Sequence, residues 1–331
     1  MEVLNVRVLM ALLVSFAVTA LLGRVVIPWL RAMKAGQSIK EIGPIWHKDK
    51  EGTPTMGGIM FIGGIIAAVF TAGLPELQKG SYGGVIVLLL AIIYGLIGFF
   101  DDFMKVKHHQ NEGLTASQKF LLQLAAAIVV ILLLRNTGYL TSDLYLPFLN
   151  TTLQVPWSLY MIFASFVIVG TVNAVNITDG VDGLASNVTE PVVIFMMLIA
   201  ILWHRTELAV FAAAVSGGLW GFLIYNRHPA KVFMGDTGSL FLGGAVAGLA
   251  FGLDIPLALV FMGVVYIAET MSDIIQVAYF KATHGKRIFR MAPLHHHFEM
   301  GGWNEERVVR VFTLVSLIGC LLAFAGVIGR Y

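Results

Sequence analysis

Long apolar runs are the feature that most constrains how this chain can fold. Runs of around twenty apolar residues recur along its 331 residues, of which 57% are hydrophobic and 13% are charged. Because a helix rises about 1.5 Å per residue, roughly 20 such residues cross the ~30 Å hydrocarbon layer of a membrane. The alternating segments of about ten residues that are typical of a membrane β-barrel are absent from the sequence. We therefore predict an all-α, polytopic membrane protein with a single domain over residues 1–331.

The apolar runs predict about ten transmembrane helices, at roughly 5–27, 56–74, 83–100, 119–135, 157–175, 187–204, 207–225, 238–253, 255–280 and 308–328. With both termini outside, 17 of the 22 Lys and Arg residues fall in loops on the inner side. Cytoplasmic loops of membrane proteins carry such an excess. We therefore expect both termini on the outer (periplasmic or extracellular) side. A net charge of +2 predicts no nucleic-acid partner, and the single Cys320 leaves no disulfide framework.

Five loops on the predicted inner side hold nearly all of the unusual polar residues. They are residues 47–58, 101–119, 173–183, 226–239 and 291–306. A site for a water-soluble anionic substrate at the cytoplasmic face needs such a one-sided concentration of carboxylates, Lys, His and glycine-rich turns. We therefore predict an active site formed by cytoplasmic loops. The outer stretch 136–156 is polar, with β-branched and aromatic residues, and indicates a short hairpin.

Two adjacent carboxylates, Asp101 and Asp102, close the third apolar run. On an α-helix their side chains diverge by about 100°, so they cannot both chelate one ion from an undistorted backbone. This favours two different roles. A solvated helix end is the alternative, but Lys105, Lys107 and Lys119 follow closely, and three further acidic loops lie on the same predicted face.

The stretch 173–183 carries Asn173, Asn176, Asp179 and Asp182 at every third position. If it begins as a helix, the first three form one polar stripe, and Gly180 then helps to break the helix into a loop. A polar stripe at a membrane end is costly unless it binds something. Hydrogen bonding between packed helices is the alternative interpretation.

In the stretch 232–239, Asp236 lies between two glycines and leads directly into the next apolar run. Backbone N–H groups at a helix start suit a phosphate, and a carboxylate suits Mg²⁺. An ordinary loop turn is the alternative interpretation. Phe233, three residues earlier, could stack on a nucleotide base.

Three consecutive histidines, His295, His296 and His297, follow the ninth run. Consecutive residues cannot all converge on one Zn²⁺ ion without severe distortion, so binding of a phosphate or sugar is the better interpretation. Glu269 and Asp273 lie four positions apart in the ninth run, where they are expected to be interior and polar, in either a functional or a structural role.

Together these motifs resemble one known family over essentially the whole chain, the polyprenyl-phosphate N-acetylhexosamine-1-phosphate transferases. The motifs GTPTMGG (52–58), DD (101–102), NAVNITDGVDGLA (173–185), VFMGDTGS (232–239) and PLHHHFE (293–299) stand in the family's order. Five motifs in register are highly specific. The His-rich segment favours the members that use UDP-MurNAc-pentapeptide over relatives that take UDP-N-acetylglucosamine.

The resemblance implies a Mg²⁺-dependent reaction at a bacterial cytoplasmic membrane. Undecaprenyl phosphate attacks the β-phosphorus of UDP-MurNAc-pentapeptide, giving lipid I and UMP for peptidoglycan synthesis. Direct attack and a route through an aspartyl-phosphate use the same carboxylates, so both stay open. The glycine-rich spans would permit a homodimer. The same chemistry on UDP-N-acetylglucosamine, a secondary transporter and a scaffold protein are the alternative functions.

The resemblance also implies roles for individual residues. The implied catalytic residues are Asp101, Asp102, Asp236 and His295, with Asp236 as the metal ligand. One of Asp101 and Asp102 is a candidate base for the lipid phosphate, and the other could orient Lys119 or a metal-bound water. The implied substrate-binding residues are Lys50, Thr55, Lys119, Asn173, Asn176, Asp179, Gly180, Val181, Asp182, Asn226, Phe233 and His296.

Within this set, Phe233 is expected to stack on the uracil, which is edged by Gly180, Val181 and Asp182. The ribose and diphosphate side is expected to be lined by Lys50, Thr55, Asn176 and Asp179. Asn226 is expected to contact the diphosphate or Mg²⁺. For His295 and His296 the alternatives are substrate binding and bracing of Asp179.

Overall fold

The computed structural model of the chain describes residues 2–33, 50, 52–108 and 113–330. Residues 47–49, 51 and 109–112, which belong to two of the predicted inner loops, lie outside the described residues. The helices are α1 (Glu2–Ala32), α2 (Gly58–Ala72), α3 (Leu74–Gln78), α4 (Gly83–His108), α5 (Ala116–Asn136), α6 (Trp157–Thr178), α7 (Leu184–Leu202), α8 (Thr206–Asn226), α9 (Gly235–Gly252), α10 (Leu259–Met262), α11 (Val264–Ala282), α12 (Leu294–Glu299) and α13 (Glu305–Val327). Two short 3-10 helices are η2 (Pro256–Ala258) and η3 (Ile328–Arg330).

Among the described residues, seven helices are long and apolar enough to cross a membrane, namely α1, α4, α5, α6, α7, α8 and α13. There are eight if α10 and α11 are counted as one bent span. The protein is therefore a polytopic all-α membrane protein, as the apolar runs predict. The remaining two predicted spans correspond to α2, with 15 residues, and α9, with 18. Ten spans and an outer location of the termini stay predictions.

Helix α9 forms the centre of the bundle. Its residues from Thr237 to Gly252 are all buried, and α4 and α6 pack along it. Glycine lets these helices approach closely, because a Cβ added at Gly243 would lie 2.5 Å from the Cα of Val172 on α6. Since protein rather than lipid surrounds α9, this helix does not need the long apolar surface of a lipid-facing span.

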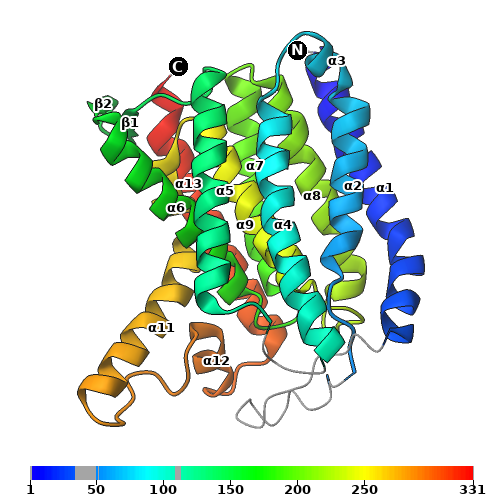
Figure 1. Ribbon diagram of the computed structural model, residues 1–331, viewed down its shortest axis with the longest axis vertical. Helices are drawn as coiled ribbons and strands as arrows, with labels where there is room; N and C mark the ends of the chain where they lie inside the picture. The colour runs from blue at the N-terminus through cyan, green and yellow to red at the C-terminus, as the bar shows by residue number, and fades with distance from the viewer. Residues whose placement is uncertain (1, 34–49, 51, 109–112, 331) are drawn as a thin grey trace.

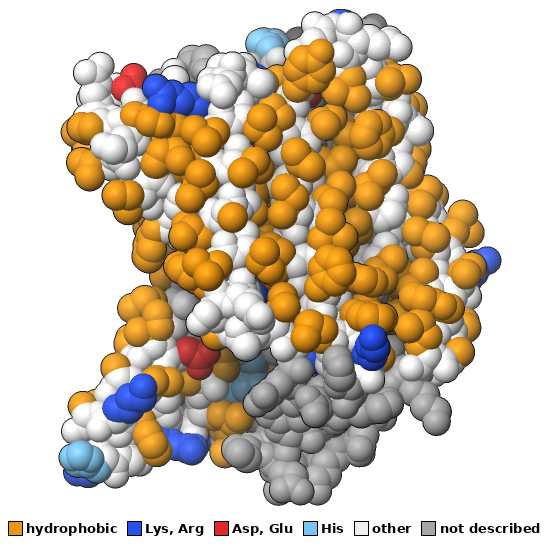
Figure 2. Space-filling view, viewed as in Figure 1, with side chains coloured by type: hydrophobic (Ala, Val, Ile, Leu, Met, Phe, Trp, Pro, Cys, Tyr) orange, Lys and Arg blue, Asp and Glu red, His pale blue; other side chains and the backbone are white. Residues whose placement is uncertain are grey.

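Figure 1 shows the helices standing side by side, with both chain ends at the same end of the bundle. Helix α12 and the far end of α11 lie at the opposite end. In the face drawn in Figure 2, hydrophobic side chains cover the wall of the bundle, and most of the charged and His side chains lie towards its two ends. This distribution fits a lipid-facing wall between two aqueous surfaces.

The predicted outer hairpin is present. Strand β1 (Asp143–Leu146) pairs antiparallel with β2 (Thr151–Gln154), and Leu144 lies opposite Leu153. The structure therefore confirms the hairpin expected within residues 136–156.

The ninth predicted span, 255–280, is not one straight helix. It breaks at Gly263, and η2–α10 and α11 are bent from each other by 78°. Glycine has low helix propensity, which makes it a common place for such a break. The bend carries α11 away from the bundle, and α12 lies between its far end and the other helices (Figure 1).

Candidate active site

The C-terminal end of α4 lies at the end of the bundle opposite the chain termini (Figure 1), and three carboxylates from α4 and α9 meet there. Asp101 and Asp102 lie near the C-terminal end of α4, and Asp236 lies in the first turn of α9. One oxygen from each lies within 4.8 Å of the others, so the group could hold a metal ion. Asp101 and Asp102 are both buried. We call these three residues the carboxylate cluster.

Two ammonium groups compensate part of the charge of the carboxylate cluster. Lys105 Nζ is 2.6 Å from Asp101 Oδ2 and 3.0 Å from Asp236 Oδ2. Lys119 Nζ is 2.8 Å from Asp236 Oδ2 and 3.8 Å from Asp101 Oδ2. Burial alone would raise the pKa of Asp236, but its hydrogen bond with Asp101 and the charges of Lys119 and Lys105 outweigh burial and lower that pKa. Asp236 is therefore held as a carboxylate.

Asp101 and Asp102 take different partners. The Asp102 carboxylate accepts hydrogen bonds from the backbone N–H groups of Asp236, at 3.2 Å, and Thr237, at 2.8 Å, and from the Thr237 hydroxyl, at 2.7 Å. Asp101 Oδ1 instead accepts from the backbone N–H of Leu114 at 2.8 Å. Asp102 thus binds the start of α9, and Asp101 binds the loop after α4.

Although Asp101 and Asp102 are neighbours on one helix, each places an oxygen within 4.8 Å of the other carboxylates of the cluster, and separate roles for the two stay a prediction. Both offer an oxygen to the same group because the first turn of α9 packs directly against α4. A Cβ added at Gly98 would lie only 2.1 Å from the carbonyl oxygen of Asp236, so glycine makes this close approach possible. Asp236 therefore lies within reach of both side chains.

The turn into α9 depends on Gly235. Its φ is +69°, and a Cβ added there would lie 2.6 Å from both Asp102 Oδ2 and Thr55 Oγ1. A side chain would therefore be strained and would collide with two predicted site residues. Asn176 also contacts Asp236. Its Nδ2 donates to Asp236 Oδ1 at 2.8 Å and to Ser239 Oγ at 2.7 Å.

A second group of charges, the Lys50 network, consists of Lys50, Asp182, His228 and Glu305. Lys50 Nζ donates to Asp182 Oδ1 and Glu305 Oε2, both at 2.7 Å. Asp182 Oδ2 is 2.9 Å from His228 Nδ1 and accepts from the backbone N–H of Ala230 at 2.9 Å. Asp182, His228 and Glu305 could hold a metal ion, and the single Lys50 ammonium, which pairs with both carboxylates, offsets one of their two charges. The structure thus groups Lys50 with Asp182, the residue predicted beside the base.

Asp179 is an acidic residue without an ion-pair partner among the described residues. It follows the last residue of α6 and is half-buried, and its side chain has no hydrogen-bond partner in the described part of the chain. Desolvation, then the charges of Asp236 and Asp102, raise the pKa of Asp179 well above its usual value. A costly, unpaired acid of this kind is typical of a binding or catalytic site.

Two of the predicted histidines are paired with glutamates. His295 is buried, and its Nδ1 lies 2.9 Å from Glu269 Oε2, whereas its Nε2 has no partner among the described residues. That ring faces Gly180, where an added Cβ would lie 2.1 Å from Nε2. His296 Nδ1 lies 2.7 Å from Glu299 Oε2. The structure therefore places His295 against the turn after Asp179.

Two predicted residues have their side chains engaged elsewhere. Asn173 Nδ2 donates to Gln123 Oε1 at 2.7 Å and to the carbonyl of Val169 at 2.8 Å, so it pairs with α5 rather than with the carboxylate cluster. Asn226 Nδ2 donates to the carbonyl of Val232 at 2.9 Å. Asn226 thus holds the loop that carries Phe233, and its buried Oδ1 has no partner in the described part of the chain.

The sequence prediction missed several residues of the two groups. Lys105 could have been assigned from its i+4 spacing to Asp101, and Thr237 from its place beside Asp236. For Glu305 there is no local signal, because 255 positions separate it from Lys50. His228 likewise reaches Asp182 from a different loop.

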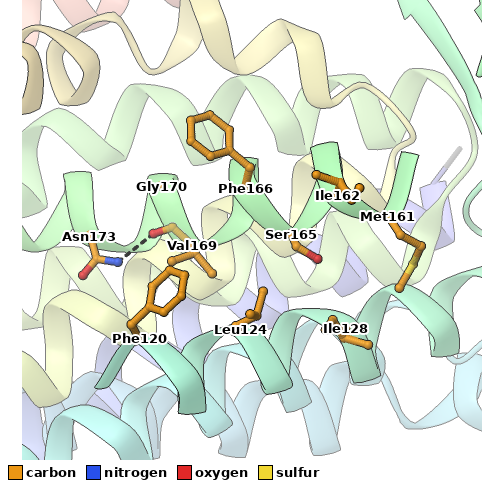
Figure 3. A pocket seen from close by; sticks show the side chains of 10 residues that line it. All are labelled: Phe120, Leu124, Ile128, Met161, Ile162, Ser165, Phe166, Val169, Gly170 and Asn173. Atoms are coloured by element: carbon orange, nitrogen blue, oxygen red, sulfur yellow. Dashed lines mark hydrogen bonds between the residues drawn. The ribbon is translucent and has the colours of Figure 1, made fainter. Parts of the chain in front are cut away.

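An apolar pocket lies between α5 and α6 (Figure 3). Its volume is about 640 Å³, with Phe120 and Leu124 on one wall and Phe166 and Val169 on the other. Asn173 lies at one end of the pocket (Figure 3). Phe120 is the neighbour of Lys119, whose ammonium contacts Asp236. An apolar chain in this pocket would therefore begin next to a cationic group.

Comparison with known proteins gives two matches to segments that contain residues of this site. A family model described as glycosyl transferase family 4 matches residues 85–254, which include the whole carboxylate cluster. A phospho-N-acetylmuramoyl-pentapeptide-transferase signature matches residues 50–62, which include Lys50 and Thr55.

Similar proteins cover the chain almost completely. A phospho-N-acetylmuramoyl-pentapeptide-transferase of Clostridium acetobutylicum is 47% identical over 324 residues, which make up 97% of this chain and 99% of that protein. A protein of the same name from Caldanaerobacter subterraneus subsp. tengcongensis is 47% identical over 320 residues, 96% of this chain and 98% of that protein.

Proposed function

This chain belongs to the phospho-N-acetylmuramoyl-pentapeptide-transferase family, and from that premise we propose that it transfers phospho-MurNAc-pentapeptide from UDP-MurNAc-pentapeptide to undecaprenyl phosphate. The products are UMP and lipid I. As a family member the chain is a transferase of peptidoglycan biosynthesis and an integral membrane protein. The specific substrates, the metal and the residue roles given below are part of the proposal.

The proposed location is the bacterial cytoplasmic membrane, with the site facing the cytoplasm. Two observations support it. The C-terminal end of α4, which carries Asp101 and Asp102, lies at the end of the bundle opposite both termini (Figure 1), and the Lys and Arg residues concentrate in the loops at that same predicted end. A water-soluble nucleotide substrate would reach the site from that side.

The observation that carries the proposal is the convergence of three carboxylates and two lysines near an apolar pocket between α5 and α6, two helices long and apolar enough to span a membrane. Phosphoryl transfer needs positioning and charge neutralisation more than covalent chemistry from the protein. The apolar pocket suits a polyprenyl chain, and the neighbouring ammonium groups suit its phosphate. A scaffold protein would have no need for either feature.

The carboxylate cluster fits Mg²⁺, which prefers one or two carboxylates together with phosphate oxygens and water. Asp236 is the proposed ligand, and Asp101 and Asp102 each place an oxygen in the same group. When bound, the ion would neutralise charge on the diphosphate and on the leaving UMP. Asn176 orients Asp236 from the other side, through its hydrogen bond to Oδ1.

We propose direct attack rather than an aspartyl-phosphate route, because the lipid phosphate is already a competent nucleophile. One of its oxygens forms a bond to the β-phosphorus, the bond from that phosphorus to the bridging oxygen breaks, and the electron pair leaves with UMP. Asp101 is the candidate base for any proton on the lipid phosphate. Asp102 is less suited, since three hydrogen bonds commit it to the start of α9.

The nucleotide end is proposed to lie at the Lys50 network. Two carboxylates and one ammonium leave a net negative charge there when His228 is neutral, which disfavours a diphosphate and suits the donor and acceptor edge of uracil. Phe233 is the proposed stacking partner, and Gly180 and Val181 edge the base. Thr55 and Asp179 lie between this network and the diphosphate.

The deciding experiment is a UMP-release assay with purified protein, Mg²⁺ and undecaprenyl phosphate. UDP-MurNAc-pentapeptide is expected to yield UMP, and UDP-N-acetylglucosamine is expected to yield far less. UMP from the second donor alone would overturn the assigned sugar nucleotide. Uptake of substrate into vesicles without UMP release would indicate a transporter instead. A phosphorylated enzyme that turns over on adding lipid phosphate would contradict direct attack.

A further inference from the structure

Glu305 joins the Lys50 network from a distant part of the chain. It is the first residue of α13, and it is buried although it carries a charge. Burying a carboxylate costs free energy unless close partners compensate for it. Its partners therefore indicate what the residue is for.

The start of α13 does not itself require a buried acid. Asn304 provides the N-cap, since its side chain accepts a hydrogen bond from the backbone N–H of Arg307 at 2.9 Å. Glu306, in the same first turn, is exposed to solvent and is equally placed to interact with the helix dipole. A helix-stabilising role alone would not bury Glu305.

The contacts of Glu305 Oε2 run to residues of the proposed nucleotide site, and the longest of them is to His228 Nδ1, at 3.7 Å. Glu305 Oε2 accepts from Lys50 Nζ at 2.7 Å and from the backbone N–H of Asp182 at 3.1 Å. Lys50 Nζ also donates to Asp182 Oδ1 at 2.7 Å. The three residues thus form a closed ring of contacts in which Glu305 holds the Lys50 side chain and the Asp182 main chain at once.

This ring has a clear physical consequence. A lysine side chain has many rotamers, and holding its ammonium between two buried carboxylates removes most of that freedom before a ligand binds. The backbone of Asp182 is fixed within the turn between α6 and α7, beside Gly180 and Val181. Preorganisation of this kind strengthens binding without any contact to the ligand.

We propose that Glu305 is a positioning residue of the nucleotide site, which acts through Lys50 and Asp182 and does not touch the substrate. The inference rests on the proposed function, because it takes the ligand at this site to be a uridine nucleotide. It extends that function to the C-terminal helix, which lies outside both matched family segments.

The test compares Glu305→Ala with Glu306→Ala, since each change removes one acid from the first turn of α13. UMP binding to the full-length protein is measured by calorimetry, beside steady-state kinetics with both substrates. Glu305→Ala is expected to weaken UMP binding about tenfold or more relative to Glu306→Ala and to raise the KM for UDP-MurNAc-pentapeptide similarly. The kcat and the KM for undecaprenyl phosphate are expected to stay within about twofold of the control.

Two further variants separate positioning from general stability. Glu305→Gln keeps an acceptor oxygen and is expected to lose less affinity than Glu305→Ala. In a Lys50→Met background, Glu305→Ala is expected to cause a much smaller additional loss, because its main route of action is already removed. If Glu305→Ala does not fold, Glu305→Gln is compared with Glu306→Gln by the same criteria.

Equal UMP affinity in the Glu305 and Glu306 variants would overturn the inference. A fall in kcat at unchanged UMP affinity would do the same, as would fully additive losses in the Lys50→Met background. If the wild-type protein binds UMP and releases it from UDP-MurNAc-pentapeptide, such results contradict only the positioning role. A wild-type protein that does neither would contradict the proposed function itself.

Discussion

The carboxylate of Asp102 binds the start of α9 through both the backbone N–H and the hydroxyl of Thr237. Its neighbour Asp101 makes neither contact and pairs with Lys105 instead. The two adjacent acids therefore have different roles. Asp102 joins α4 to α9, whereas Asp101 pairs with a charged side chain of the site.

This difference predicts opposite behaviour in two single variants. Asp102→Ala is expected to destabilise the protein by about 1–2 kcal/mol or more, because it removes the acceptor for the first N–H groups of α9. Asp101→Asn is expected to reduce turnover strongly with little change in thermal stability. Melting temperatures in detergent, measured beside UMP release, check both. Equal melting temperatures for the two variants would contradict the division of roles.

Asp236→Asn tests the metal role. The variant keeps the shape of the side chain but loses the charge that two lysines and a metal share, so activity is expected to fall by about a thousandfold. Raising the Mg²⁺ concentration is expected to restore little. Asp143→Asn, in the β1–β2 hairpin, is the control. Near-normal turnover by Asp236→Asn would refute the assignment of Asp236 as a ligand.

Asp179 is expected to contribute a pH dependence of stability. Because burial and the nearby acids raise its pKa above 3.8 in the folded state, the folded protein holds a proton that the unfolded chain has already released. Stability from this group is therefore present at low pH and is lost as the pH rises from about 4 to the raised pKa.

The variant Asp179→Asn lacks the titrating carboxyl group, so the loss of stability with rising pH is expected to disappear. In the absence of metal and substrate it is expected to melt at a higher temperature than wild type at pH 8, and to show a flatter pH profile, while its activity falls by about tenfold or more. Thermal melts across pH, with Asp143→Asn as control, measure the difference. Identical profiles for Asp179→Asn and wild type would contradict the raised pKa of Asp179.

Gly180→Ala tests the approach of His295 to the turn after α6. A Cβ at this position would lie 2.1 Å from His295 Nε2, so the turn or the ring must move, and nucleotide binding is expected to weaken. Adding His295→Ala is expected to recover part of the lost melting temperature, because it removes the clash. Gly170→Ala is the control, since a Cβ there meets nothing within 4 Å. A melting temperature of Gly180→Ala equal to that of the control would contradict the contact.

Gly170→Leu tests the apolar pocket. The position lines the pocket and has open space, so the larger side chain is expected to be tolerated and to occupy part of the volume (Figure 3). The KM for undecaprenyl phosphate is expected to rise about fivefold or more, with UMP binding unchanged. Val129→Leu, an exposed change on α5 outside the pocket, is the control. An unchanged KM for undecaprenyl phosphate would exclude the pocket as the binding site of the lipid chain.

Much of the fold was predictable because apolar surface is a property of a local stretch of sequence. The long apolar runs of α1, α4 and α13 predict helices without any information about the segments that pack against them. Two exceptions have tertiary causes. Helix α9 is enclosed by protein, so its glycine-rich sequence reflects packing, and after the 78° bend at Gly263 helix α11 packs against α6.

The sequence by itself determined that this is a helical membrane protein whose acids, lysines and histidines gather in a few loops, and its motifs determined the family. Only the tertiary structure decided which of those groups meet. It joined Lys50 to Glu305 across 255 positions, tied Asp102 to α9, and turned Asn173 towards Gln123. The hydropathy of a segment depends on residues that are neighbours in the chain. Ion pairs form between groups that are close in space, and the spacing of two residues along the sequence does not determine that distance.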